Sequence, residues 1–291
     1  MVAVGFPGPH LELGTAGAEM LERLRSAVHG RGGEAIRQLA LITVLYLGYR
    51  VGRMITADDT ARAFGNAHAL LDVEDRLGIL AETTVQAPFL RWDRLAIPAN
   101  FYYATAHFTV AVAVIVWLWV FRPRHYRMTR NLMVGLTGTG LLLHVLLPLA
   151  PPRMLPERGF VDLAALHGQS VYGPRDSEGM SNQFAAMPSL HVGWALLLAV
   201  AVVAATRTRW RWLALAHPTL TTIIVIGTGN HYWLDAIIAV LLLAGIAVLH
   251  QMILPAAASW APSAQRTSAT SRTLGAVTDQ RLPSSRQTDR T

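Results

Sequence analysis

The chain has 291 residues, of which 52% are hydrophobic and only 15% are charged, and its mean hydropathy is +0.34. This composition is typical of a membrane protein and excludes an ordinary soluble domain. The formal net charge is +7, and the absence of Cys excludes disulfides and thiolate sites.

The basic residues are all arginines, which indicates a high-GC bacterial coding bias. They occur in short clusters beside apolar runs. That distribution follows the positive-inside rule and differs from the continuous basic stripe of a nucleic-acid-binding surface. We therefore expect a membrane as partner and no nucleic acid.

Six apolar runs organise the chain, and each is about long enough to cross a bilayer as a helix. They cover residues 37–56, 98–121, 131–150, 187–206, 211–229 and 231–254. The sequence predicts an all-α polytopic integral membrane helix bundle with six transmembrane helices. We place the catalytic domain at 36–255, after a cytoplasmic N-terminal segment at 1–35 that lacks the pattern of a cleaved signal peptide.

Two further segments differ from the apolar runs in composition. Residues 60–77 carry apolar side chains at helical spacing but are too short and too charged to cross, which predicts an interfacial helix on the outer side, ended by Gly78. Residues 256–291 are rich in Ser, Thr, Arg, Pro and Gln without apolar periodicity, which predicts a disordered cytoplasmic tail.

Arginine counts in the loops predict the orientation. The loops around 122–130 and 207–211 hold arginines and no acidic residue, whereas 56–97 holds seven acids against four arginines. The arginine-rich loops should therefore be cytoplasmic. The loops at 56–97 and 150–186 should face outward, on the extracytoplasmic side of a bacterial inner membrane.

Two histidines stand at the mouths of apolar runs on that outer side. His191 and His231 are forty residues apart, the distance of two crossings and a turn, so both return to the same face. Asp235 follows His231 by four residues and shares its helix face, where a carboxylate can hold an imidazole in one tautomer and leave the other nitrogen free to attack. Arg153 reaches the same face and can bind phosphoryl oxygens with its fork of donors.

Other readings of these residues stay open. The two histidines and Asp235 could form a facial metal triad, although Arg153 nearby would repel a cation, and we expect neither metal nor cofactor. A small transporter or an assembly partner is a non-enzymatic alternative, but the chain has no inverted repeat or broken helix pair. His107 and His144 lie deeper in their helices, where structural pairing is the favoured reading.

Three short motifs carry a family resemblance: 150–153 reads Ala-Pro-Pro-Arg, 187–191 reads Met-Pro-Ser-Leu-His, and 229–235 reads Gly-Asn-His-Tyr-Trp-Leu-Asp. In order and spacing they resemble the type-2 phosphatidic acid phosphatase superfamily, most closely its inositol-phosphotransferase branch, which includes the inositol phosphorylceramide synthases. The resemblance implies a six-helix membrane enzyme acting on a phospholipid or another lipid-linked phosphate. It also implies that His231 is the nucleophile that forms a phosphohistidine, with Asp235 as its orienting partner and His191 as the general acid.

The resemblance further implies that Arg153 is a phosphate ligand, with hydrogen bonds added from Ser189 and Asn230. The wider superfamily supplies a Lys and a second Arg that this chain lacks. Arg53 and Arg50 stand near the outer end of the first run, and we expect at least one of them to bind phosphate. Snorkelling to headgroups is the alternative for both.

The motifs depart from the wider superfamily at three positions. Arg153 is followed by Met154 where the superfamily has Pro, Leu190 replaces a Gly, and Val225 stands where the second Arg is usual. These departures favour transfer of a phosphate-linked headgroup, such as inositol phosphate, over hydrolysis of simple lipid phosphates or polyprenyl pyrophosphates, which remains the alternative.

Overall fold

The computed structural model describes residues 17, 19, 32–56, 59–168 and 183–259. Most of the predicted N-terminal segment 1–35 and of the predicted tail 256–291 lies outside these residues. The chain divides into two units, 1–246 and 247–291, and the second is described here only as the end of the last helix.

The described residues are helical almost throughout, which confirms the all-α class. Six longer helical segments are α2 (Gly32–Thr56), α5 with η1 and α6 (Asp93–Phe101, Tyr102–Ala106 and His107–Phe121), α7 (Pro123–Leu146), α9 (Leu190–Ala205), η4 with α10 (Arg209–Leu215 and Ala216–Gly227) and α11 (Trp233–Ser259). The shorter helices are α3 (Thr60–Leu77), α4 (Glu82–Arg91), η2 (Pro152–Met154), η3 (Pro156–Arg158) and α8 (Leu163–Leu166). The described part of the chain contains no strand, only one isolated bridge between Leu149 and Ala185.

Each predicted apolar run coincides with one of the six longer segments. Among the described residues, however, only Asp93–Phe121 and Trp233–Met252 are both long and apolar enough to be candidate membrane spans, and α9 is apolar but shorter. The others fall short because α2 and α7 carry arginines and α10 has 12 residues. Two candidate spans are thus established, whereas six crossings are not.

Helix α3 has the amphipathic pattern expected of it. Its small and apolar side chains Ala63, Ala67, Leu70 and Leu71 are buried, and most of its charged side chains are exposed. Gly78 adopts φ 65°, and its N–H bonds the carbonyl of Asp75 to close the helix. The predicted helix at 60–77 and its end at Gly78 are therefore confirmed.

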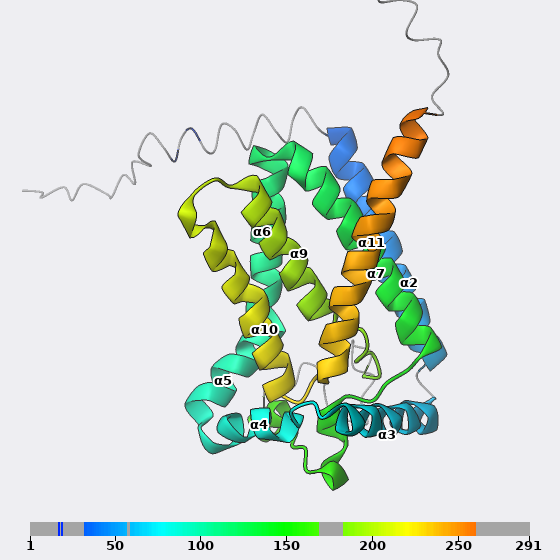
Figure 1. Cartoon of the computed structure of the whole chain (residues 1–291), viewed down its shortest axis with the longest axis vertical. Helices are drawn as coiled ribbons and strands as arrows, with labels where there is room; N and C mark the ends of the chain where they lie inside the picture. The colour runs from blue at the N-terminus through cyan, green and yellow to red at the C-terminus, as the bar shows by residue number, and fades with distance from the viewer. Residues whose placement is uncertain (1–16, 18, 20–31, 57–58, 169–182, 260–291) are drawn as a thin grey trace, which may run out of the picture. The chain divides into compact units, whose positions relative to one another are not determined.

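Different elements meet at the two ends of the helical unit 1–246 (Figure 1). At one end, Arg122 Nε donates to the carbonyl of Ala205 at 3.0 Å, so the α6–α7 turn lies beside the end of α9. At the other end, the start of α9, the end of α10 and the start of α11 meet, and α3 and α4 lie against them. The functional candidates all belong to this second end.

One helix is interrupted without being broken. Between α5 and α6 the five residues of η1 form a π-helical turn, so that Asp93–Phe121 continues as one long helix with a widened segment. Tyr103 of this turn is buried and its ring stacks on His191 of α9, with ring centroids 4.5 Å apart. Such widened turns often occur at functional sites.

Candidate active site

The site is built on the tight turn between α10 and α11. The N–H groups of Asn230 and His231 both bond the carbonyl of Val225, at 2.9 and 3.1 Å, and reverse the chain. Gly229 makes this possible with φ 70°, and a Cβ there would lie 2.9 Å from Gln86 Nε2 and 3.3 Å from Arg153 Cβ. Both the backbone conformation and the space therefore demand glycine.

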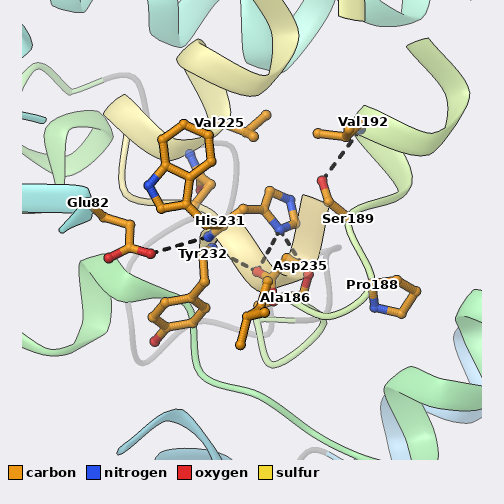
Figure 2. Close-up of polar contacts among 12 residues, drawn as sticks. Glu82, Ala186, Pro188, Ser189, Val192, Val225, His231, Tyr232 and Asp235 are labelled. Atoms are coloured by element: carbon orange, nitrogen blue, oxygen red, sulfur yellow. Dashed lines mark hydrogen bonds and ion pairs between the residues drawn. The ribbon is translucent and has the colours of Figure 1, made fainter. Parts of the chain in front are cut away.

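His231 is held in one orientation by two acceptors. Its Nδ1 lies 2.8 Å from the carbonyl oxygen of Ala186 and 3.2 Å from Asp235 Oδ2 (Figure 2). Because both neighbours accept, the hydrogen of the neutral ring must sit on Nδ1, and Nε2 keeps its lone pair. Asp235 Oδ2 also accepts from the Tyr232 N–H at 2.9 Å, which fixes the carboxylate in turn.

Tyr232 anchors the turn to the segment that contains Ala150. Its side chain is fully buried, and its hydroxyl donates to the carbonyl of Ala150 at 2.8 Å. Burial raises the pKa of the Tyr232 phenol, and the carboxylates of Asp235, Glu82 and Glu74 raise it further. The hydroxyl therefore stays protonated and remains a donor.

Arg153 lies in η2, the short helix that follows α7, and is almost completely buried. Its backbone N–H bonds the carbonyl of Gly229 at 2.8 Å, its Nη1 donates to Asn230 Oδ1 at 2.7 Å, and its Nε lies 3.7 Å from Asp162 Oδ2. These contacts orient the planar guanidinium beside the turn that carries His231. The arrangement suits a fork-shaped ligand for an anion.

His191 occupies the first turn of α9, opposite His231. The two ring centroids are 6.0 Å apart, and His191 is held between Tyr103 and His107, whose centroids lie at 4.5 and 4.9 Å. Its Nε2 is buried and has no hydrogen-bond partner among the described residues. A group of this kind is available to a substrate atom that enters between the two imidazoles.

A cavity of about 380 Å³ joins these groups. Its lining includes the polar side chains of Arg153, Asn230, His191 and His231 together with the aromatic rings of Tyr49, Tyr103, Phe108 and Trp194. Its volume and mixed lining are typical of a site for a small ligand or for part of a larger one.

The structure brings together five of the eight predicted site residues: His231, Asp235, His191, Arg153 and Asn230. Asp235 lies behind His231 and is fully buried. Since its Oδ2 bonds His231 Nδ1, it does not share an open position with both imidazoles as a facial triad would require. Within the described residues, no three His, Asp or Glu side chains are grouped as ligands of one ion.

The remaining predicted residues are placed differently. Ser189 is the N-cap of α9, where its hydroxyl accepts from the Val192 N–H at 3.4 Å, and it is buried outside the cavity lining. Arg50 is exposed on α2, while its neighbour Tyr49 contributes to the cavity. The side chain of Arg53 lies outside the described part of the structure.

The two deeper histidines both line the cavity. His144 Nε2 lies 3.2 Å from the carbonyl oxygen of Pro188, the kind of pairing expected for it. His107 differs, since neither of its ring nitrogens has a hydrogen-bond partner within the described residues. Its ring instead stacks on that of His217 at a centroid distance of 5.5 Å and is tilted against that of His191 at 4.9 Å.

Several buried polar residues around the site were not anticipated. Gln86 of α4 exchanges two hydrogen bonds with the backbone of Val161, at 2.9 and 3.0 Å, and so fixes the loop beside Gly229. Glu74 and Glu82 reach the first turn of α11. A signal for Glu74 was present, because it continues the helical spacing of the buried Ala67, Leu70 and Leu71 along one face of α3.

Comparisons with known proteins agree with this geometry. A family model described as the PAP2 superfamily matches residues 68–250, which is more than half of the chain and includes all three motifs. Neither the curated proteins nor the solved structures contain a match to the chain.

Proposed function

The chain belongs to the PAP2 superfamily, and on this premise we propose that it is a membrane enzyme that transfers or hydrolyses lipid-linked phosphate through a phosphohistidine at His231. Membership of the superfamily indicates phosphatase or phosphotransferase activity on lipid phosphates. The observation that carries the histidine mechanism is the double anchoring of His231 Nδ1 by Ala186 and Asp235, which leaves Nε2 as the nucleophilic nitrogen.

The proposed first step is a displacement at phosphorus. His231 Nε2 attacks, an N–P bond forms, and the P–O bond to the leaving group breaks. His191 gives its proton to the departing oxygen. Arg153 and Asn230 bind the non-bridging oxygens, whose negative charge is concentrated in the transition state.

The second step reverses the first with a different oxygen. Water or an alcohol attacks phosphorus, His191 takes up its proton, and the N–P bond breaks to restore His231. Dividing one difficult displacement into two is the usual advantage of covalent catalysis. The same two imidazoles would serve both steps, since both line the cavity and their ring centroids lie 6.0 Å apart.

We further propose six membrane crossings with the site on the extracytoplasmic side of a bacterial inner membrane. The arginine-rich segments at 122–130 and 207–211, which include the start of α7 and of η4, lie together at the end opposite the site, as the bond from Arg122 to Ala205 supports. By the positive-inside rule that end faces the cytoplasm. Two apolar helices and the superfamily membership already indicate a membrane protein.

Transfer is the preferred form of the reaction. Phe108 and Trp194 line the same cavity as Arg153. We infer that the cavity holds an acceptor or an inositol-type headgroup as well as the phosphate. The departures at Met154, Leu190 and Val225 from the phosphatase-like pattern favour the same branch. Plain hydrolysis is the competing outcome of the test below.

The test is direct trapping of the intermediate. Purified protein is incubated briefly with ³²P-labelled phospholipids of different headgroups, quenched in alkali, which preserves phosphohistidine, and analysed for protein-bound label. We expect label on the wild type and none on His231→Ala. His68→Ala is the matched control, since His68 is half-exposed on α3, and it should label normally.

Adding acceptor alcohols then separates the two reactions. Release of label as a phosphate ester of the added alcohol identifies a transferase, whereas release as inorganic phosphate or as the phosphate of the donor's own headgroup identifies a hydrolase. Turnover without any labelled protein, or unchanged labelling of His231→Ala, would reject the phosphohistidine mechanism.

A further inference from the structure

Three consecutive amides at the start of α11 are each bonded by a different carboxylate. The Tyr232 N–H donates to Asp235 Oδ2 at 2.9 Å, the Trp233 N–H to Glu82 Oε1 at 3.2 Å, and the Leu234 N–H to Glu74 Oε1 at 2.7 Å. The first amides of a helix have no partner within the helix, and one capping side chain usually satisfies one of them. Here α3, α4 and α11 each supply an acceptor.

The two glutamates are buried, with 4% and 3% of Glu74 and Glu82 exposed. Placing two carboxyl groups in the interior beside Asp235 is unfavourable, because like charges repel and each loses its hydration. A neutral cap such as Ser or Asn would satisfy the same amides at less cost. The arrangement therefore calls for a role beyond ordinary capping.

The position of the helix start determines the geometry of the candidate nucleophile. Asp235 lies in the first turn of α11, and its Oδ2 is shared between the Tyr232 N–H and His231 Nδ1. Any movement of this turn moves Asp235 relative to His231. Glu74 and Glu82 hold the turn from two helices that lie outside the candidate membrane spans (Figure 2 shows the bond from Glu82).

Glu74 Oε2 is buried and has no hydrogen-bond partner among the described residues, so ionising this carboxyl group beside Glu82 is unfavourable. Burial raises the pKa of Glu74 to about 9, with Glu82 and Asp235 as the further causes. The carboxyl groups of Glu74, Glu82 and Asp235 also raise the pKa of the Tyr232 hydroxyl, whereas the Arg153 guanidinium lowers it. At neutral pH Glu74 is therefore protonated, and its other oxygen still accepts from Leu234.

We propose that Glu74 and Glu82 are positioning residues of the active site, two buried carboxyl groups that fix the start of α11 and, through Asp235, the orientation of His231. Loss of the Glu74 proton at alkaline pH would then loosen this turn. The kinetic part of this inference rests on the proposed function, while the structural part does not.

The pH dependence of fold stability follows from the raised pKa of Glu74. A carboxyl group that holds its proton more tightly in the folded chain stabilises the fold fully below its unfolded pKa. That contribution is lost as the pH rises through the folded value of about 9. We therefore expect the melting temperature of the wild type in detergent to fall between pH 6 and pH 9.5.

The variants separate the proton from the hydrogen bond. Glu74→Gln keeps an acceptor for the Leu234 N–H but cannot ionise, so its melting temperature should depend less on pH than that of the wild type. Glu74→Ala removes this acceptor. Asp75→Asn is the matched control, since Asp75 is the next residue of α3 and is exposed, and it should behave as the wild type.

Two readouts then test positioning. Hydrogen exchange of the peptide that contains Tyr232–Leu234 should be at least tenfold faster in Glu74→Ala than in Glu74→Gln. With an activated aryl ester, whose leaving group does not need the proton of His191, Glu74→Ala should lose at least tenfold in kcat with KM within twofold of the wild type. Glu74→Gln should recover most of that loss at pH 7.5.

Each measurement tests a different part of this inference. Equal exchange and equal kcat in Glu74→Ala and the wild type would overturn the positioning role. The same pH dependence of melting in Glu74→Gln and the wild type would overturn the role of the Glu74 proton. If the wild type turns over no phosphate ester, the proposed function fails, and the exchange and melting measurements still decide this inference.

Discussion

Adding a single methyl group to Gly229 should disable the site with only a small loss of fold stability. In Gly229→Ala the backbone keeps a φ of 70°, which costs an L-residue about 1–2 kcal/mol. The new Cβ would stand 2.9 Å from Gln86 Nε2, 3.3 Å from Arg153 Cβ and 3.4 Å from the Arg153 backbone nitrogen. The Arg153 backbone nitrogen and Cβ cannot rotate away as the end of a side chain can. Arg153 and the turn must therefore separate by a few tenths of an ångström.

That separation acts on the bond between the Arg153 N–H and the Gly229 carbonyl, and so on the guanidinium and on His231 together. A misplacement of about 1 Å costs roughly 100-fold in rate. We expect Gly229→Ala to lower kcat/KM by about tenfold to 100-fold, equivalent to about 1.4–2.7 kcal/mol of transition-state stabilisation.

Gly168→Ala is the matched control for this experiment. Gly168 has a φ of 63° and nothing within 4 Å of its added Cβ, so it carries the same backbone strain without the contacts. The two variants should melt within a few degrees of each other, and Gly168→Ala should keep wild-type kcat/KM on the best lipid phosphate. Wild-type kcat/KM in Gly229→Ala would refute the reasoning that the turn and Arg153 form one rigid unit.

Four shorter predictions concern roles and topology. His191→Ala should slow ordinary lipid phosphates far more than activated aryl phosphates, and equal slowing would reject the general-acid role. Arg53→Lys or Arg50→Lys should lower kcat/KM by roughly tenfold if that arginine binds phosphate as a fork, whereas wild-type kinetics in both would make them membrane anchors. Activity should survive EDTA, and its loss with rescue by one divalent metal would instead favour a metal mechanism. A cysteine at the exposed Leu166 should react with an impermeant maleimide on intact cells and one at the exposed Arg124 should not; the reverse would place the site in the cytoplasm.

The sequence was informative where spacing alone fixes geometry. His231 and Asp235 lie four residues apart at a helix start, and the structure joins them at 3.2 Å. The apolar runs predicted the long helical segments, and Gly78 predicted the end of α3. In each case the determining interaction is local, so periodicity and turn chemistry are sufficient.

Contacts between distant segments were beyond the reach of spacing. Gln86 and Glu82 lie within 56–97, which the sequence placed in an outward-facing loop, yet both are buried against the α10–α11 turn. Ser189, which the resemblance suggested as a phosphate ligand, is the N-cap of α9, because a serine before a helix satisfies a free amide of its first turn. Burial of a polar side chain depends on what packs over it, which one sequence read alone does not reveal.

The widened turn η1 has a consequence for how this chain can be aligned with its relatives. A π-helical turn accommodates one residue more than an α-helical turn would, and each residue of an α-helix advances the face by about 100°. Residues before Tyr102 and after Ala106 are therefore out of phase with a single uninterrupted helix. A relative that is one residue shorter at 102–106 could keep every apolar position of the span and yet turn the counterpart of Tyr103 away from His191. Alignment of this helix should permit a one-residue gap at η1, since the gap, and not a substitution, would record the change in the active site.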